Sequence, residues 1–225
     1  MLVKDWMSKD VIKIDENESM QEAIKYLKEH DIRMLPVMKK GKLVGIVTDR
    51  DLKRASASDA TLLEIHELIY ILAQIKVKEI MTKNPITVPF DYTVEETAEI
   101  LLTNKISGAP VVDHEGQLMG TITQSDIFKV LVSLTGLSKR GISFSFMVED
   151  RSGSIKEVTD IIRAYGGRMA SILSSYERIP KGYRRVYVRM YNVDRSRIPQ
   201  LKEELKAKAA LLYMVDHREN AREIF

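Results

Sequence analysis

Two segments of the chain end an apolar run with a threonine that is followed three residues later by an aspartate. Thr48 with Asp51, and Thr123 with Asp126, complete the same pattern, Gly-x-x-Thr-x-x-Asp. Thr-x-x-Asp is a capping pattern, in which the two side chains satisfy free backbone N–H groups where a helix begins. A carboxylate in that position can also accept hydrogen bonds from two adjacent ribose hydroxyls, while the free N–H groups favour an anionic phosphate. Capping and ligand binding are compatible.

The two patterns belong to a longer internal repeat. The segment "MSKDVIKI" (7–14) aligns with "MTKNPITV" (81–88) at an offset of 74 residues, and one inserted residue later raises the offset to 75. Each copy predicts a short strand, a helix, two strands and a second helix. The first helix of each copy begins at a capping-box spacing, Ser19 with Glu22 and Thr93 with Glu96. Neither copy can cover its small sheet alone, so we expect a pseudo-symmetric pair.

A helix is predicted between the copies. Thr61 with Glu64 has capping-box spacing, and the apolar residues that follow are too many for one buried stripe. We therefore expect the helix to pack on another subunit. Its apolar residues are Leu62, Ile65, Leu68, Ile69, Leu72 and Ile75.

The pattern changes after residue 141. "ISFSFMV" (142–148) alternates between apolar and polar residues, which predicts a strand with one buried face. A helix with Ser154 and Glu157 as a capping box, two strands around a turn at 180–182, a helix over about 197–208 and a strand at 210–217 follow. This order is the ferredoxin-like split βαβ arrangement, which does not by itself define a function.

Composition favours a binding protein over an enzyme. The 225 residues include no Cys, and the four His lie on four different predicted elements, so we expect no metal site. No nucleophile elbow, phosphate-binding loop or dinucleotide fingerprint is present. Residues 139–225 contain 18 basic and 11 acidic residues, whereas the whole chain has a net charge of only +3. No apolar run approaches a membrane span and the first residues lack a signal peptide, so we expect a cytoplasmic protein.

Over roughly residues 1–135, the tandem Gly-x-x-Thr-x-x-Asp pattern resembles a pair of cystathionine-β-synthase (CBS) domains, or Bateman module. The stretch "VEDRSGSIKEV" is similar to the start of an ACT domain, and the two together resemble the acetoin-utilisation protein B-like group of bacterial regulatory proteins. The resemblance implies an α/β (α+β) fold, with a pseudo-two-fold CBS pair and a βαββαβ ACT domain. The implied boundaries are 1–60 and 77–135 for the CBS domains, 61–76 for the linking helix, 136–141 for a linker and 142–220 for the ACT domain.

The resemblance also implies two clefts for adenine nucleotides, each combining the Thr and Asp of one copy with the first strand and pre-proline segment of the other. Cleft one would contain Thr48, Arg50, Asp51, Ile86, Thr87, Ser107, Gly108, Ala109 and Pro110. Cleft two would contain Ile12, Lys13, Arg33, Met34, Leu35, Pro36, Thr123, Ser125 and Asp126. We favour cleft one, because its walls at Gly108 and Ala109 are small, whereas Met34 and Leu35 fill the same positions in cleft two. The choice among AMP, ADP, ATP and S-adenosyl compounds stays open.

Two features of the third unit have alternative interpretations. The loop Asp150, Arg151, Ser152, Gly153 and Ser154 resembles the ACT loop that binds amino acids or other small acids; the alternative is a tight turn in a unit that only dimerises. On the strand "YRRVYVRMY" (183–191), alternation puts two Arg and two Tyr on the side away from the helices. Such a face can bind single-stranded nucleic acid or form a subunit interface. We favour the interface, and so expect a homodimeric regulatory sensor without a nucleic-acid partner.

Overall fold

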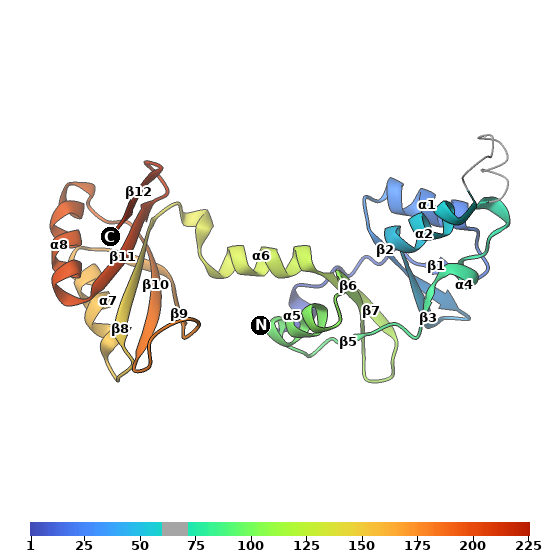
Figure 1. Cartoon of the computed structure of the whole chain (residues 1–225), viewed down its shortest axis with the longest axis horizontal. Helices are drawn as coiled ribbons and strands as arrows, with labels where there is room; N and C mark the ends of the chain where they lie inside the picture. Colours follow the sequence, from blue (N-terminus) through green and yellow to red (C-terminus); the bar gives the residue numbers. More distant parts are fainter. Residues whose placement is uncertain (60–71) are drawn as a thin grey trace. The chain divides into compact units, whose positions relative to one another are not determined.

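The computed structural model describes residues 1–59 and 72–225, which form two compact units, Met1–Phe128 and Lys129–Phe225 (Figure 1). Most of the helix predicted over 61–75 lies outside the described residues, and residues 72–74 are helical. Within the described part of the chain, no helix is long and apolar enough to cross a membrane.

The first copy of the repeat folds around the strand hairpin that ends in Thr48. Its sheet has the order β1-β2-β3-β4, with β1 parallel to β2 and the other neighbours antiparallel. The hairpin turn uses positive φ at Lys40 and Gly41, which glycine adopts without strain. The elements of this copy are β1 (Ile14–Asp15), α1 (Met20–Glu29), β2 (Met34–Lys39), β3 (Lys42–Thr48) and α2 (Asp49–Asp59).

The second copy repeats this order, which confirms the predicted sequence of elements. Its strands have the order β5-β6-β7, with β5 parallel to β6 and β6 antiparallel to β7. The predicted capping box of Thr93 and Glu96 is present at the start of α5, whereas at α1 Ser19 accepts the Glu22 N–H. The elements are β5 (Val88–Pro89), α5 (Val94–Thr103), β6 (Gly108–Val112), β7 (Leu118–Thr123) and α6 (Gln124–Leu134).

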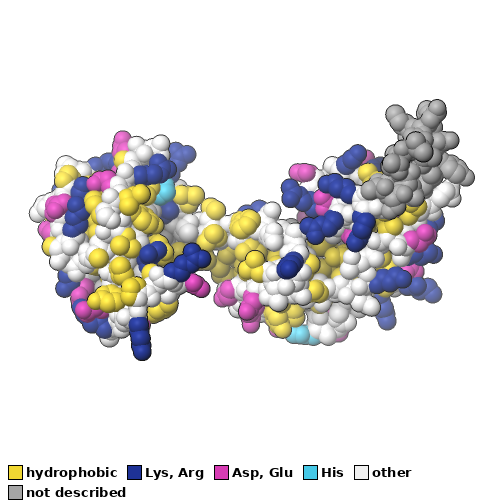
Figure 2. Space-filling model, viewed as in Figure 1, with side chains coloured by type: hydrophobic (Ala, Val, Ile, Leu, Met, Phe, Trp, Pro, Cys, Tyr) yellow, Lys and Arg dark blue, Asp and Glu magenta, His cyan; other side chains and the backbone are white. Residues whose placement is uncertain are grey.

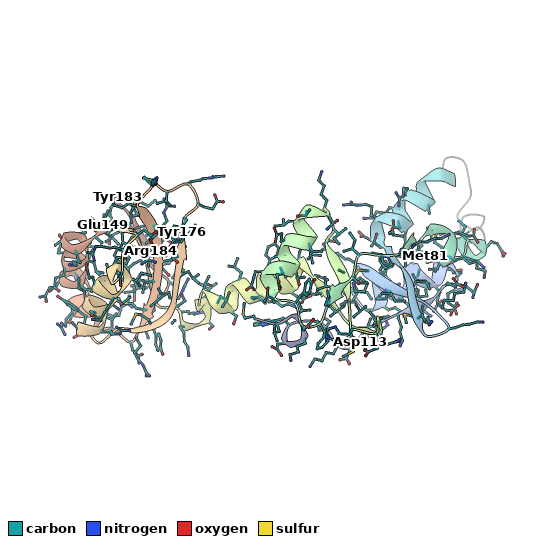
Figure 3. All side chains as sticks on the ribbon, turned by 90° about the horizontal axis from the view of Figure 1, so that it is seen from below. Met81, Asp113, Glu149, Tyr176, Tyr183 and Arg184 are labelled. Carbon is teal, nitrogen blue, oxygen red and sulfur yellow. The ribbon has the colours of Figure 1, made fainter. Side chains whose placement is uncertain are left out.

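Each copy is completed by a short segment that crosses over from elsewhere in the chain. The segment around the 3-10 helix η1 (Val3–Asp5) packs on the second copy, where Ser8 and Thr121 exchange two backbone hydrogen bonds of 2.9 and 3.0 Å. In return, α4 (Val77–Ile80) and β4 (Thr82–Lys83) pack on the first copy, with β4 pairing with β3. Figure 3 shows Met81 among the elements of the first copy.

The crossing explains the glycine of the repeated pattern. A Cβ atom at Gly120 would lie 2.6 Å from Met7 Sδ and 2.8 Å from the Ser8 carbonyl oxygen. At Gly45 it would lie 2.5 Å from Met81 Sδ and 3.0 Å from the Thr82 oxygen. The methionine side chains can move away, but the backbone oxygens of Ser8 and Thr82 cannot, so glycine lets the crossing backbone approach this closely.

The C-terminal unit is a five-stranded sheet with two helices on one face. The strand order β12-β11-β8-β10-β9 contains the ferredoxin-like βαββαβ arrangement, which confirms the predicted fold. The predicted alternation holds, because Phe144, Phe146, Val186 and Val188 are all within 1% of full burial and face the helices. The elements are η2 (Leu137–Lys139), β8 (Ile142–Glu149), α7 (Ser154–Ala164), β9 (Arg168–Ser175), β10 (Tyr183–Tyr191), η3 (Arg195–Arg197), α8 (Ile198–Lys208), β11 (Ala210–Asp216) and β12 (Ala221–Ile224).

The close crossing over Gly120 generates a stability prediction. Gly120→Ala should destabilise the protein by about 1–3 kcal/mol, because the added methyl group overpacks against the backbone oxygen of Ser8. Gly45→Ala is the matched comparison and should cost less. A methionine sulfur is the nearest atom at both positions, but the backbone oxygen is 3.0 Å away at Gly45 and 2.8 Å away at Gly120. Urea denaturation of the two variants checks the order, and equal stability of Gly120→Ala and the unaltered protein would refute the role of the crossing.

Candidate functional site

The Thr-x-x-Asp pattern of the first copy closes the junction between β3 and α2. Asp51 Oδ2 accepts hydrogen bonds from the Thr48 backbone N–H at 3.0 Å and from Thr48 Oγ at 2.6 Å. The Asp51 backbone N–H in turn donates to Thr48 Oγ at 3.3 Å. The capping interpretation is therefore observed. It uses one carboxylate oxygen and leaves Oδ1 available for another partner.

The second copy reproduces this geometry at the junction of β7 and α6. Asp126 Oδ2 accepts from the Thr123 N–H at 3.0 Å and from Thr123 Oγ at 2.7 Å, and the Asp126 N–H donates to Thr123 Oγ at 3.4 Å. Both aspartates are buried, with 7% exposure for Asp51 and 6% for Asp126. A carboxylate held this firmly is preorganised to accept hydrogen bonds from a ligand.

Arg54 is the present partner of the second oxygen in the first copy. Its Nη2 donates to Asp51 Oδ1 at 2.7 Å. The Arg54 side chain is 74% exposed whereas the Asp51 side chain is only 8% exposed, so the arginine can move while the carboxylate stays fixed. Two adjacent sugar hydroxyls are a chemically suitable replacement for the guanidinium at Oδ1. If the hydroxyls displaced the Arg54 guanidinium from Oδ1, or shared that oxygen with it, the guanidinium would remain beside the site and could bind a phosphate.

The residues that precede Pro36 and Pro110 lie beside the Thr-x-x-Asp units of their own copies. In the first copy Met34 is the register partner of Thr48, and in the second copy Gly108 is the partner of Thr123. The combination of segments from different copies, which the family resemblance implies, stays a prediction. Leu35 and Ala109 are fully buried in the cores of their copies and cannot line a cleft. The predicted difference in size between the walls of the two clefts therefore depends on Met34 in cleft two and Gly108 in cleft one.

The remaining predicted cleft residues differ in exposure. Arg50, Ile86 and Ser107 of cleft one are exposed, and Thr87 is half-buried, while Pro110 is buried. In cleft two, Lys13, Arg33 and Ser125 are exposed, Ile12 is half-buried and Pro36 is buried. The exposed cations Arg50, Lys13 and Arg33 are thus accessible to an anion in each predicted cleft.

A second polar cluster surrounds the loop from Asp150 to Ser154 in the C-terminal unit. Arg184 Nη2 donates to Ser154 Oγ at 3.0 Å, and Arg184 Nε lies 3.6 Å from Asp150 Oδ1. Tyr176 donates its hydroxyl to the same Asp150 oxygen at 3.3 Å. Glu149, Tyr176, Tyr183 and Arg184 lie at one end of this unit in Figure 3. Sequence reasoning missed Arg184, which reaches the loop from β10, 30 residues away along the chain.

The predicted capping box of Ser154 and Glu157 is wrong. The residue before the helix is Gly153, whose φ is 85°, and no side chain caps α7. Ser154 Oγ instead donates to the Arg151 carbonyl at 3.1 Å and accepts from Arg184. Glu157 forms two hydrogen bonds to the Arg151 guanidinium, at 2.7 and 3.0 Å, so its carboxylate is engaged elsewhere. Within the described residues, no group of three or more His, Cys, Asp or Glu could hold a metal ion.

Comparison with known proteins identifies the first unit. The family model of the CBS domain matches residues 3–58 and 77–133, which together make up half of the chain. A CBS domain-containing protein of Dictyostelium discoideum is 35% identical over 135 residues, covering 60% of this chain and 93% of that protein. The chain belongs to the CBS domain family, and its repeat is a CBS pair.

Other relatives carry the pair as part of a larger protein. The inosine-5'-monophosphate dehydrogenase of Korarchaeum cryptofilum is 38% identical over 125 residues, which are 56% of this chain but only 23% of the enzyme. The CBS domain pair of protein MJ0100, solved in complex with 5'-methylthioadenosine and S-adenosyl-L-methionine, has 36% identity and a TM-score of 0.50, covering 58% of this chain and 95% of that chain. Residues 134–225, which contain the five strands of the C-terminal unit, lie outside the residues that the family model matches.

The loop cluster generates a prediction on pH. Hydrogen bonds from Arg151 and then Lys208 lower the pKa of Glu157 to about 2. Because this pKa is below the ordinary value of about 4.3, the ion pairs favour the folded state above that value and are lost as the pH falls toward 2. An NMR titration of the Glu157 carboxyl should show this pKa, and Arg151→Gln should raise it more than Lys208→Gln does. A Glu157 pKa that does not change in Arg151→Gln would contradict the assignment.

Proposed function

We propose that the protein is a non-catalytic regulator whose CBS pair binds small molecules that contain adenosine. The observation that carries this proposal is the pair of buried aspartates, each held by its threonine through one oxygen, with the fold of a CBS pair around them. The solved pair of protein MJ0100 in complex with two adenosine compounds supports the choice of ligand class.

We rank cleft one, which contains Asp51, above cleft two. The predicted wall opposite Asp51 carries Gly108, which leaves room for a flat base, whereas the corresponding wall of cleft two carries the half-buried Met34. Arg50 and Arg54 are both exposed and lie one turn or less from Asp51, where they can neutralise a phosphate.

We assign the C-terminal unit as an ACT-like domain that binds an amino acid or another small acid at the Asp150–Ser154 loop. Arg184 supports this assignment, because its guanidinium offers a fork for a ligand carboxylate while Asp150 offers an acceptor for an amino group. Signalling between the two units would follow from a population shift, in which the ligand favours the arrangement of the pair that binds it more tightly.

The first functional prediction concerns Asp51. Asp51→Asn should weaken binding of S-adenosylmethionine, 5'-methylthioadenosine, AMP or ATP by about 10- to 100-fold, because a hydrogen bond to a charged group contributes about 1.5–3 kcal/mol. Asparagine retains an oxygen for the Thr48 N–H, so the start of α2 is preserved. Thermal-shift measurement with each compound checks the prediction, because a ligand that binds the native state raises the melting temperature.

The control is the same change in the second copy. Asp126→Asn should weaken binding less than Asp51→Asn does, and equal losses would overturn the ranking of the clefts. If none of the four compounds stabilises the unaltered protein at millimolar concentration, the proposal of an adenosine sensor is wrong. Amino acids belong in the same panel, because they test the loop of the C-terminal unit.

A further prediction is that the protein is a homodimer. The prediction rests on the apolar pattern of residues 61–75, most of which lie outside the described residues, and on Leu102 of α5, which is 73% exposed. Contact through apolar surfaces would bury such side chains. Light scattering at micromolar concentration should give twice the chain mass of 25.7 kDa, with little dependence on salt. A monomeric mass at that concentration would refute the dimer.

A further inference from the structure

The sheet of the C-terminal unit presents a polar face on the side opposite α7 and α8. β10 places four half-buried side chains on this face: Arg185, Tyr187, Arg189 and Tyr191. The next strand contributes Ser143 and Ser145, which are the register partners of Arg189 and Tyr187. Figure 2 shows Lys and Arg side chains bordering an apolar area of this unit. The four β10 side chains, together with Ser143 and Ser145, are called the open face below.

The open face holds most of the unpaired buried polar atoms in the described part of the chain. Arg185 Nε, Arg189 Nε, Arg189 Nη1 and Ser145 Oγ are buried without a hydrogen-bond partner. Burial lowers the pKa of Arg189, as expected for a cation that is removed from water. Buried donors in native proteins are almost always paired with protein or water, so these atoms have the capacity to bind acceptors from outside the chain.

The charge of the open face defines that occupant as an anion. Among the described residues, no carboxylate forms an ion pair with Arg185 or Arg189. The β8 register partners of Arg185, Tyr187 and Arg189 are Met147, Ser145 and Ser143. The acid of β8 on this side, Glu149, lies opposite Tyr183 at the other end of β10 and pairs with Arg151. A second copy of the same face would bring arginine toward arginine, which argues against the subunit interface that we favoured for this face from the sequence alone.

A hollow of about 800 Å³ lies at the end of β10, next to this face. Tyr191 belongs to both, because it follows Arg189 on the same side of β10 and lines the hollow. The volume is within the range of about 300–1,000 Å³ that is typical of small-molecule sites. Its basic lining residues are Lys139, Arg140, Arg195 and Arg218.

The cations of the hollow exceed its anions. Arg195 is paired with Asp216, but Lys139, Arg140 and Arg218 form no ion pair within the described residues. The acid of the lining, Asp194, accepts from the Ser196 N–H at 3.0 Å and from Ser196 Oγ at 2.7 Å, both through Oδ1, and forms no ion pair with the three other cations of the lining. Three cations thus surround the hollow, and Lys139 lies over the Tyr191 ring at 5.6 Å.

We propose that the hollow binds a small molecule with at least two oxyanion groups. One group would bind among Lys139, Arg140 and Arg218, and the other would extend past Tyr191 toward Arg189, which lies on the open face outside the lining of the hollow. Arginine forks fit both carboxylates and phosphates, so the shared chemistry is an oxyanion held by two hydrogen bonds. A small molecule fits better than a nucleic-acid strand, because three of the cations converge on one hollow instead of following the strand.

The experiment uses the full chain with inorganic pyrophosphate and citrate as probes, at constant ionic strength. Isothermal titration calorimetry should show saturable binding, and preference for one probe identifies phosphate or carboxylate as the ligand group. Arg140→Gln and Arg218→Gln should each weaken binding at least fivefold, and both residues are exposed, so the fold should be retained. Arg189→Gln should weaken it as well.

The matched control is Arg163→Gln, which removes the same charge from α7, where Arg163 is paired with Asp160. It should leave probe binding unchanged. Absence of saturable binding, or an equal loss in Arg163→Gln, would overturn the proposal. Submicromolar binding of a single-stranded oligonucleotide that is lost in Arg189→Gln would replace it with a nucleic-acid surface. Dissociation of a dimer in Arg189→Gln, with probe binding intact, would replace it with a subunit interface.

Discussion

The hydrogen bonds between threonine and aspartate at the ends of β3 and β7 decide where a strand stops and a helix starts. One carboxylate oxygen receives both the backbone N–H and the hydroxyl of the threonine, which fixes the carboxylate relative to the sheet. The second carboxylate oxygen is held in a fixed orientation, although it forms none of the capping hydrogen bonds. In the first copy this second oxygen accepts from the exposed Arg54, so a group that stabilises the fold also presents a fixed acceptor at the surface.

The C-terminal unit uses its charges differently at its two ends. Around Asp150 the charges are paired within the unit, and Arg151 contacts both Glu149 and Glu157. Around Tyr191 the cations are largely without acids, and the buried arginine donors of β10 lack partners. The charges of the first arrangement form ion pairs within the unit, although Arg184 Nε has no hydrogen bond, whereas the second arrangement is the basis of the proposed oxyanion site. A polar cluster that is incomplete in this way is a stronger indication of binding than charge alone.

Much of the fold follows from local patterns in the sequence. The alternation of 142–148 and the capping pair of Thr93 and Glu96 involve residues that are close in sequence, so their meaning does not depend on the rest of the fold. The contact of Arg184 with Ser154 could not be predicted, because it depends on the register between β8 and β10. β12 was also not predicted, since "AREI" is short and half of it is charged.

The same limit applies to the site. The repeat located both aspartates, and capping rules gave their hydrogen bonds to threonine. The crossing of residues 7–8 over Gly120 is a pairing across more than 100 residues, for which composition offers no signal. Only the repetition of Met with Ser or Thr at 7–8 and 81–82, together with the repeated glycine, could have indicated it.

The crossing also orders the events of protein synthesis. The first copy is completed by residues 77–83, so every segment of its core exists once these have been made. Ser8, by contrast, pairs with Thr121, and at ordinary rates of translation the ribosome needs on the order of ten seconds to cover that interval. During this time the first copy can fold on the nascent chain before Ser8 has its partner on β7. The burial of Val3 and Met7 in the second copy couples the two halves of the pair, and it cannot be complete until β7 has been made.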